Sequence, residues 1–325
     1  MKHLFVYLIT LLALAVPLNA MALSGKPGDV DGNDVVDVGD ITELISLVLN
    51  GGGADFDIAD VDRNGTEDIT DVTLLIGYVL GTMDLPAIEQ EFTVNDVTFV
   101  MIPVEGGSFL MGATEEQGDD AIDRELPVHQ VTLSSFYIGQ TEVTQNLWCA
   151  VMGDYPSYFS GGQLPVETVS WDDCQQFIAA LNDLTGMQFR LPTEAEWEFA
   201  ARGGNESEGY KYAGSNNLAS VGWYSYNDSW TVRGTGTHGT HTVATRNPNE
   251  LMIYDMSGNV HEWCQDWYGT YSAEAQIDPT GPATGTNRVY RGGSWYFDEW
   301  FCRVSFRNGV APTYRSYGIG LRLAL

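Results

Sequence analysis

Two twelve-residue segments with the same pattern of oxygen-bearing side chains constrain this chain most. The first is DVDGNDVVDVGD, residues 29–40, and the second is DVDRNGTEDITD, residues 60–71. Each places carboxylates or amides at loop positions 1, 3, 5, 9 and 12 and offers a backbone carbonyl at position 7, the spacing that wraps a loop around one calcium ion. The expected ligands are Asp29, Asp31, Asn33, Val35, Asp37 and Asp40, then Asp60, Asp62, Asn64, Thr66, Asp68 and Asp71.

Apolar residues at helical spacing follow each loop. They are Ile41, Leu44, Ile45, Val48 and Leu49 after the first loop, and Val72, Leu75, Ile76 and Val79 after the second. We therefore expect a small all-α, EF-hand-like module over residues 24–86. An acidic solvated linker is the alternative, and the duplicated ligand pattern argues against it. Asp34 stands where Gly65 stands in the second loop, so we expect the first loop to be more strained and weaker.

The N-terminal residues have the character of a signal peptide. Lys2 and His3 precede an almost unbroken apolar run over residues 4–18, and small residues follow before position 22. The run is short for a membrane span and lacks a basic flank on its far side. We expect residues 1–22 to direct export, to the extracellular space, the cell surface or the periplasm, and we expect no membrane span.

The charge balance excludes one class of partner. With 15 basic and 44 acidic residues, the formal net charge is −29, and phosphate recognition needs a basic surface. We therefore expect no nucleic-acid binding. The four cysteines, Cys149, Cys174, Cys264 and Cys302, could pair in an exported protein, but their spacing does not say how.

Strand-like and loop segments dominate residues 92–325. Residues 97–112 and 128–139 each read as a pair of strands, the first around a Gly-Gly turn. Two helices are expected, over residues 171–184 and over residues 193–201, where Thr193 and Glu196 form a capping box. The expected class is α+β and loop-rich.

Long motifs in this region resemble the sulfatase-modifying-factor family, whose founding members are formylglycine-generating enzymes. The matching strings are GGSFLMG, FYIGQTEVTQ, PVETVSWDDCQQF, RLPTEAEWEFAARGG, YDMSGNVHEWCQDWY, RGGSWYF and GIGLRLAL. The resemblance implies a C-type-lectin-like fold with structural calcium. The N-terminal repeat resembles a type I dockerin, which implies a cohesin-like partner.

A calcium site in the large domain is expected in the segment DMSGNVHE. The carboxylates of Asp255 and Glu262 bracket a turn and, with the carbonyls of Gly258 and Val260, could converge on one ion. The resemblance implies calcium at these positions. The alternative is that Asn259 and Glu262 only hydrogen-bond the loop.

The resemblance also implies a test for catalysis. Formylglycine-generating enzymes oxidise a sulfatase cysteine with oxygen at copper held by two cysteines, and two thiolates suit Cu(I). Cys302 matches the second cysteine, but Phe297 stands at the first and cannot ligate a metal. We therefore expect no copper and no catalytic residue, with Cys302 as the only candidate if the chain is an enzyme. His238 and His241 are expected to be loop residues, not an iron site.

Clusters of aromatic and small residues alternate with fixed-looking residues near the C-terminus. All of them are reachable from an asparagine codon by adenine changes, which resembles the variable region of diversity-generating retroelement proteins. Fifteen residue types pass this codon test, so chance could also satisfy it, and the aromatics could be core or ordinary surface. Tyrosine and phenylalanine suit binding surfaces. The expected ligand-binding residues are Tyr296, Phe297, Asp298, Phe301, Phe306, Asn308, Tyr314, Ser316 and Tyr317.

The sequence thus favours an exported, non-catalytic protein that binds a protein or glycan ligand through its C-terminal surface. Arginines of the framework between the clusters, among them Arg291, Arg303 and Arg322, would hold the scaffold. The alternatives are a formylglycine-generating-type oxidase or a dockerin-tethered component of a polysaccharide-degrading system.

Overall fold

The computed structural model describes residues 28–30, 35–50, 59, 61, 68–82, 87–227 and 238–325. The expected signal peptide, residues 1–22, lies outside these ranges, as do six of the expected calcium ligands: Asp31, Asn33, Asp60, Asp62, Asn64 and Thr66. None of the helices in the described ranges is both long enough and apolar enough to cross a membrane.

The N-terminal module contains the two expected helices, α2 (Val38–Asn50) and α4 (Ile69–Val79). Asp68 caps α4 and forms a capping box with Asp71. One face of each helix is buried, as the helical spacing predicted, although Ile45 and Ile76 are exposed. The small core consists of Leu44, Ala59, Val61, Val72 and Leu75.

Ten strands in the described part of the large domain form three small sheets. The first sheet has the order β1 (Gln90–Val94), β2 (Val97–Val104), β5 (Phe136–Gly139), and the second has the order β3 (Gly107–Met111), β4 (His129–Leu133), β7 (Gln276–Ile277). The third has the order β10 (Ile319–Gly320), β6 (His261–Trp267), β8 (Arg288–Arg291), β9 (Arg307–Val310).

The four expected strands exist, but the two strands of each expected pair do not pair with each other. β2 pairs with β1 and β5, whereas β3 pairs with β4, so neighbours in sequence enter different sheets. The chain passes from the first sheet to the second at Gly106. A larger residue would not fit there, because its Cβ would lie 2.6 Å from the carbonyl oxygen of Leu133.

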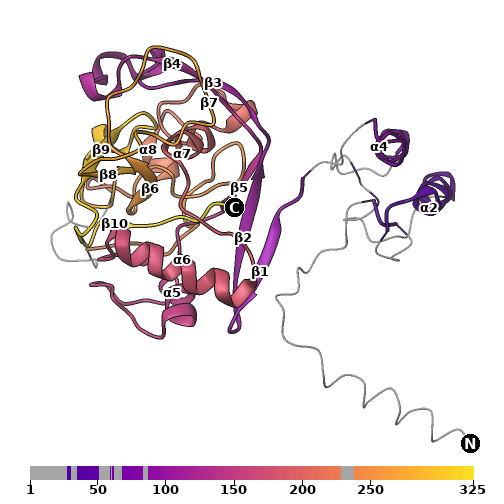
Figure 1. Ribbon diagram of the computed structural model, residues 1–325, viewed down its shortest axis with the longest axis horizontal. Coiled ribbons are helices and arrows are strands. Elements are labelled where there is room, and N and C mark those ends of the chain that lie inside the picture. Colours follow the sequence, from indigo (N-terminus) through magenta and orange to yellow (C-terminus); the bar gives the residue numbers. More distant parts are fainter. Residues whose placement is uncertain are drawn as a thin grey trace, which may run out of the picture.

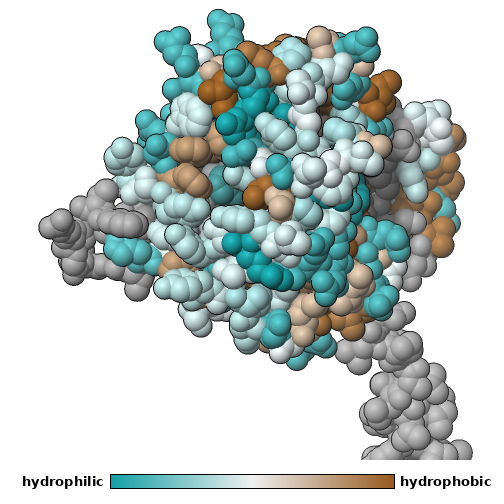
Figure 2. Space-filling model, turned by 60° about the vertical axis from the view of Figure 1, so that its left-hand side comes forward, coloured by the Kyte–Doolittle hydropathy of each residue, from teal (hydrophilic) through white to brown (hydrophobic). Residues whose placement is uncertain are grey.

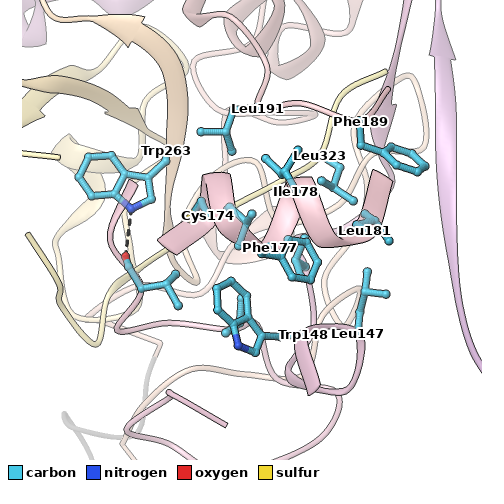
Figure 3. Packing of buried hydrophobic residues seen from close by; sticks show 14 of the residues in the cluster. Leu147, Trp148, Cys174, Phe177, Ile178, Leu181, Phe189, Leu191, Trp263 and Leu323 are labelled. Carbon is cyan, nitrogen blue, oxygen red and sulfur yellow. Dashed lines mark hydrogen bonds between the residues drawn. The ribbon is translucent and has the colours of Figure 1, made fainter. Parts of the chain in front are cut away.

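Helices pack against these sheets. The longest are α5 (Gln145–Met152), α6 (Trp171–Thr185) and α7 (Glu194–Ala201), with a short α8 (Leu218–Val221) and the 3-10 turns η1 (Glu115–Asp120), η2 (Asp123–Glu125), η3 (Gly204–Glu206) and η5 (Glu299–Cys302). The predicted inner face of α6 and the predicted capping box of α7 are both confirmed. Figure 3 shows Trp148 of α5 against Phe177 of α6, with ring centroids 4.9 Å apart.

The C-terminal segment runs back through the domain and ends beside β5 (Figure 1). The backbone of Leu325 pairs with Tyr137, and Leu323 accepts from Gly139. Because this segment is bonded to the first sheet, the loops before it are held at both ends. The fold is mixed α+β and rich in loops, as expected.

Candidate ligand-binding surface

Aromatic rings from separate C-terminal segments meet in one continuous group. The ring of Tyr296 lies 4.4 Å from that of Phe297 and 5.3 Å from that of Tyr317. Phe297 continues to Phe301 at 4.6 Å. Rings at these separations contribute about 0.5–1.5 kcal/mol per pair beyond area burial. We call Tyr296, Phe297, Phe301, Tyr314 and Tyr317 the aromatic surface.

The predicted binding residues do not all lie at the surface. Tyr314 and Tyr317 are 47% and 46% exposed, and Asp298 is exposed. Tyr296, Phe297, Phe301, Asn308 and Ser316 are partly exposed. Phe306 is only 1% exposed and packs under Phe301 at 5.1 Å, so its placement as a ligand-contacting residue is corrected. The codon pattern carries no information on burial.

A loop from the other half of the domain enlarges this surface. Tyr158 is 75% exposed, and its ring lies 6.0 Å from that of Tyr317. Phe159 packs edge-on against Trp295 at 5.4 Å. The sequence analysis did not identify this loop. The run of aromatic residues around Pro156 and Ser157 could have indicated it, because this composition is typical of exposed binding loops.

Buried ion pairs fix the segments that carry the aromatic surface. Both oxygens of Glu125 accept from Arg303, at 2.6 and 2.8 Å, and Arg307 binds Glu194 in the same two-point manner. Further buried pairs among the described residues include Arg291 with Glu198 and Arg322 with Glu262. Bidentate pairs of this kind give geometric specificity. The framework arginines therefore hold the loop ends rigidly, as expected.

Arg315 anchors the outer loop differently. It is half-exposed and pairs with Asp173 at the start of α6, with two contacts of 2.7 Å. This ties the segment that carries Tyr314 and Tyr317 to the longest helix of the domain.

Two buried polar atoms beneath the aromatic surface have no hydrogen-bond partner in the part of the chain described. They are Nε2 of His261 and Oγ of Ser294. The ring of His261 lies 5.1 Å from that of Phe297, and its Nδ1 faces the carbonyl of Arg291. Burial lowers the pKa of His261 to about 3, so this side chain is neutral at physiological pH.

The single matching cysteine is poorly suited to bind a metal. Cys302 is fully buried against Tyr212, Leu218 and Val221, and burial raises the pKa of its thiol. All four cysteines are unpaired. The described residues contain no group of three or more His, Cys, Asp or Glu side chains that could hold a metal ion. His241 stacks on Trp223 at 3.7 Å.

The expected calcium ligands of the large domain are only partly placed for that role. Glu262 accepts from Arg322 and from the indole of Trp197, so both carboxylate oxygens are in use. Asp255 accepts from Ala244 through Oδ2, while its buried Oδ1 has no partner among the described residues. A calcium ion at this site would have to compete with Arg322 for Glu262. The site remains a prediction.

The described part of the N-terminal module repeats one arrangement twice. The backbone N–H of Asp37 donates to Asp40 at 2.7 Å, and that of Asp68 donates to Asp71 at 2.8 Å. Asp40 and Asp71 are fully buried. The ninth and twelfth positions of the two loops therefore have the same geometry.

Figure 2 shows the side of the large domain on which β8, β9 and β10 are labelled in Figure 1. Strongly hydrophobic residues are scattered there among pale and hydrophilic ones. This face of the large domain is therefore mixed in polarity.

Comparison with known proteins agrees with the geometry. The profile of the sulfatase-modifying factor enzyme 1-like domain matches residues 89–325, and that of the dockerin type I domain matches residues 27–80. A formylglycine-generating enzyme of Thermomonospora curvata is 37% identical and aligns over 69% of this chain and 92% of its own length. A chaperone protein LppX of Paenibacillus barcinonensis is 32% identical, and the alignment covers 65% of this chain and 86% of the relative. The solved structure of Treponema denticola variable protein 1 is 31% identical in sequence and has a TM-score of 0.65. The match covers 74% of this chain and 99% of that protein.

Proposed function

Because this chain belongs to the sulfatase-modifying-factor family, with a dockerin type I module before the family domain, we propose that it is an exported, non-catalytic ligand-binding protein. Its aromatic surface would bind a protein or glycan. The proposed division is a signal peptide over residues 1–22, a dockerin-like module over 24–86 and the family domain over 92–325.

The observation that carries the proposal is the continuity of exposed aromatic rings on a rigid frame. Tyr317 contacts Tyr158 on one side and Tyr296 on the other, so rings from three segments form one surface. Tyrosine offers a large contact area and loses little side-chain entropy on binding. The buried Arg–Glu pairs below it would keep the surface preorganised, which reduces the cost of binding.

The substitution at the copper position supports a binding role over oxidation. Phe297 takes the place of one thiol, and its ring is part of the aromatic surface. The remaining thiol of Cys302 is buried, with a raised pKa that disfavours the thiolate needed to hold Cu(I). An oxidase remains the second candidate, because relatives named as formylglycine-generating enzymes align over most of their length.

Diversification of this surface is supported by the codon pattern and by a relative. The similar solved structure is named a variable protein. Two exposed residues of the predicted set, Tyr314 and Tyr317, could change without disturbing the fold. A near-copy of the gene's last segment, with adenines at these codons and beside a reverse transcriptase gene, is the expected finding in the flanking DNA.

The N-terminal module supports tethering. We propose that its loops bind calcium through Asp29, the carbonyl of Val35, Asp37, Asp40, Asp68 and Asp71, with the ligands outside the described residues completing each site. Asp40 and Asp71 are buried at the twelfth position of each loop, where a carboxylate would supply ligand oxygens. The loaded module would dock onto a cohesin-like partner, which would display the binding domain or attach it to a polysaccharide-degrading assembly.

The test is to select probes against the calcium-loaded full chain from a random peptide library and a glycan array. The tightest probe is then measured against Tyr296→Ala, Tyr317→Ala and the control Leu110→Ala, which removes an exposed apolar side chain on β3. Loss of binding only in the tyrosine variants supports the proposal. Stoichiometric Cu(I) uptake with oxidation of a cysteine in a sulfatase-type peptide would overturn it in favour of the oxidase.

A further inference from the structure

A second site lies away from the aromatic surface. A cavity of about 540 Å³ lies between the start of α7, strand β4 and the loop over residues 269–282. Its volume suits a small organic molecule. His129, Asp266 and Tyr271 are among the residues that line it.

Two largely buried residues of the cavity lining each present an acceptor atom that hydrogen-bonds none of the described residues. Asp266 is 4% exposed, and its Oδ2 accepts from the backbone N–H of Glu194 at 2.9 Å. Its Oδ1 makes no hydrogen bond to any residue in the described ranges. The Cβ that a side chain at Gly281 would carry lies 3.0 Å from this oxygen, so only glycine leaves the approach open.

His129 supplies the second acceptor. It is also 4% exposed, and its Nδ1 lies 3.1 Å from the carbonyl oxygen of Pro127. A carbonyl can only accept, so Nδ1 carries the proton in the neutral ring and Nε2 presents a lone pair. This Nε2 hydrogen-bonds none of the described residues. Both residues line the cavity, so a bound ligand with donors could satisfy these two acceptors in place of water.

The charged side chains around the cavity already have partners. Glu194 is held by both guanidinium contacts of Arg307 and accepts from the hydroxyl of Tyr271 at 3.1 Å. Arg307 also donates to the carbonyl of Gly269 at 2.8 Å. Neither group is free to bind a ligand ion, which leaves Asp266 and His129 as the ionisable side chains of the lining that could accept from a cationic ligand.

We propose that this cavity binds a primary ammonium on an aromatic or aliphatic body, with Asp266 and His129 accepting its N–H donors and Tyr271 lining the apolar part. An ammonium has three donors and no acceptor, which matches a site with unpaired acceptors. The net charge of −29 would attract cations to the protein. A neutral sugar would lack the charge-assisted contact that an ammonium makes with the ionised carboxylate of Asp266.

The protonation state of Asp266 should make ligand affinity at this site depend on pH. Burial, together with the negative charge of Glu194, raises the pKa of Asp266 to about 8. An ammonium binds the ionised carboxylate, so its affinity should rise as the pH rises toward that value. The ionisable groups around Asp266 include Glu194 and Glu196 on α7, Arg307 on β9, Arg288 on β8, Cys264 on β6, His129 on β4 and Tyr271 in the loop over residues 269–282.

The probe is tyramine, and its neutral counterpart 4-ethylphenol is the ligand control. Titration calorimetry on the calcium-loaded full chain should show tyramine binding at least about 10-fold tighter than 4-ethylphenol, the ratio expected for one charge-assisted hydrogen-bonded contact. The tyramine affinity should increase between about pH 6 and about pH 8.5, while that of 4-ethylphenol stays constant.

Two variants locate the site. Asp266→Asn should reduce tyramine affinity about 10-fold and remove its pH dependence, and His129→Gln should reduce it independently. Tyr317→Ala, on the aromatic surface, should bind tyramine as the wild type does. Equal affinity for tyramine and 4-ethylphenol, tighter binding of glucose than of tyramine, or wild-type affinity in both cavity variants would overturn the proposal. Thermal melting of each variant shows whether a loss of tyramine affinity arises from unfolding. If one variant is unfolded, the affinity of the other, folded variant tests the proposal.

Discussion

The rings of Tyr296 and Tyr317 lie 5.3 Å apart, although one residue follows β8 and the other precedes β10. This contact joins two C-terminal segments into one surface, and Tyr158 extends it from a distant loop. Arg315 and the buried Arg–Glu pairs position the segments. The residues available to a ligand are thus set by the framework as much as by the aromatic clusters.

Phe306 supports the surface from below, and its truncation should act on stability. Phe306→Ala should lower the free energy of unfolding by about 3–5 kcal/mol, because it empties a fully buried site. Tyr314→Ala, at an exposed site, should change it by less than about 0.5 kcal/mol. Urea unfolding of both variants checks this. Equal small effects would show that Phe306 is not a core residue.

The buried pair of Arg303 and Glu125 should be worth far more than the exposed pair of Arg315 and Asp173. Arg303→Ala leaves a buried carboxylate without its partner and should cost about 3–5 kcal/mol. Arg315→Ala removes a half-exposed ion pair and should cost less than about 1 kcal/mol. The measurement is the unfolding free energy of each variant at two salt concentrations, and only the Arg315 effect should shrink at high salt.

Asp266 should make the domain less stable as the pH rises. Its folded pKa of about 8 lies above the ordinary carboxyl value, so its stabilising contribution is complete below that ordinary value and is lost as the pH rises through about 8. Asp266→Asn should therefore gain stability relative to wild type, by up to about 1.4 kcal/mol per pH unit between about pH 4 and about pH 8. Melting curves across that range measure the difference. A constant difference would contradict the assignment.

Calcium should bind the two loops unequally. The first loop has Asp34 where the second has Gly65, so the second is expected to be the tighter site. Asp71→Ala should remove the tighter of two calcium-binding events, and Asp40→Ala the weaker. Calorimetric titration of the chelator-treated chain distinguishes these outcomes. Unchanged stoichiometry in both variants would rule out the proposed loop sites.

Helices α6 and α7 were predicted from local sequence, whereas helix α5 and the long-range strand pairing were not. Helices α6 and α7 begin where Ser170 and Thr193 cap them, a signal contained within a few residues. The separation of β2 and β3 into two sheets depends on partners far along the chain, which a local pattern does not specify.

The aromatic surface was predicted only in part, because it too depends on contacts between residues far apart in the sequence. Codon composition identified Tyr314 and Tyr317, which are exposed, but could not show that Phe306 is buried in an irregular segment without periodicity. The contribution of Tyr158 depends on two loops meeting in space. The pairing of Glu262 with Arg322, which bears on the expected calcium site, likewise joins residues 60 positions apart.

The most direct test of the binding role is the affinity of the Tyr296→Ala/Tyr317→Ala double variant for the tightest peptide or glycan selected on the wild-type chain. We predict a loss of about 100-fold or more, with Leu110→Ala unchanged and the calcium-dependent melting temperature preserved, because central aromatic residues dominate binding energy. Wild-type affinity in the folded double variant would show that the ligand binds elsewhere on the protein.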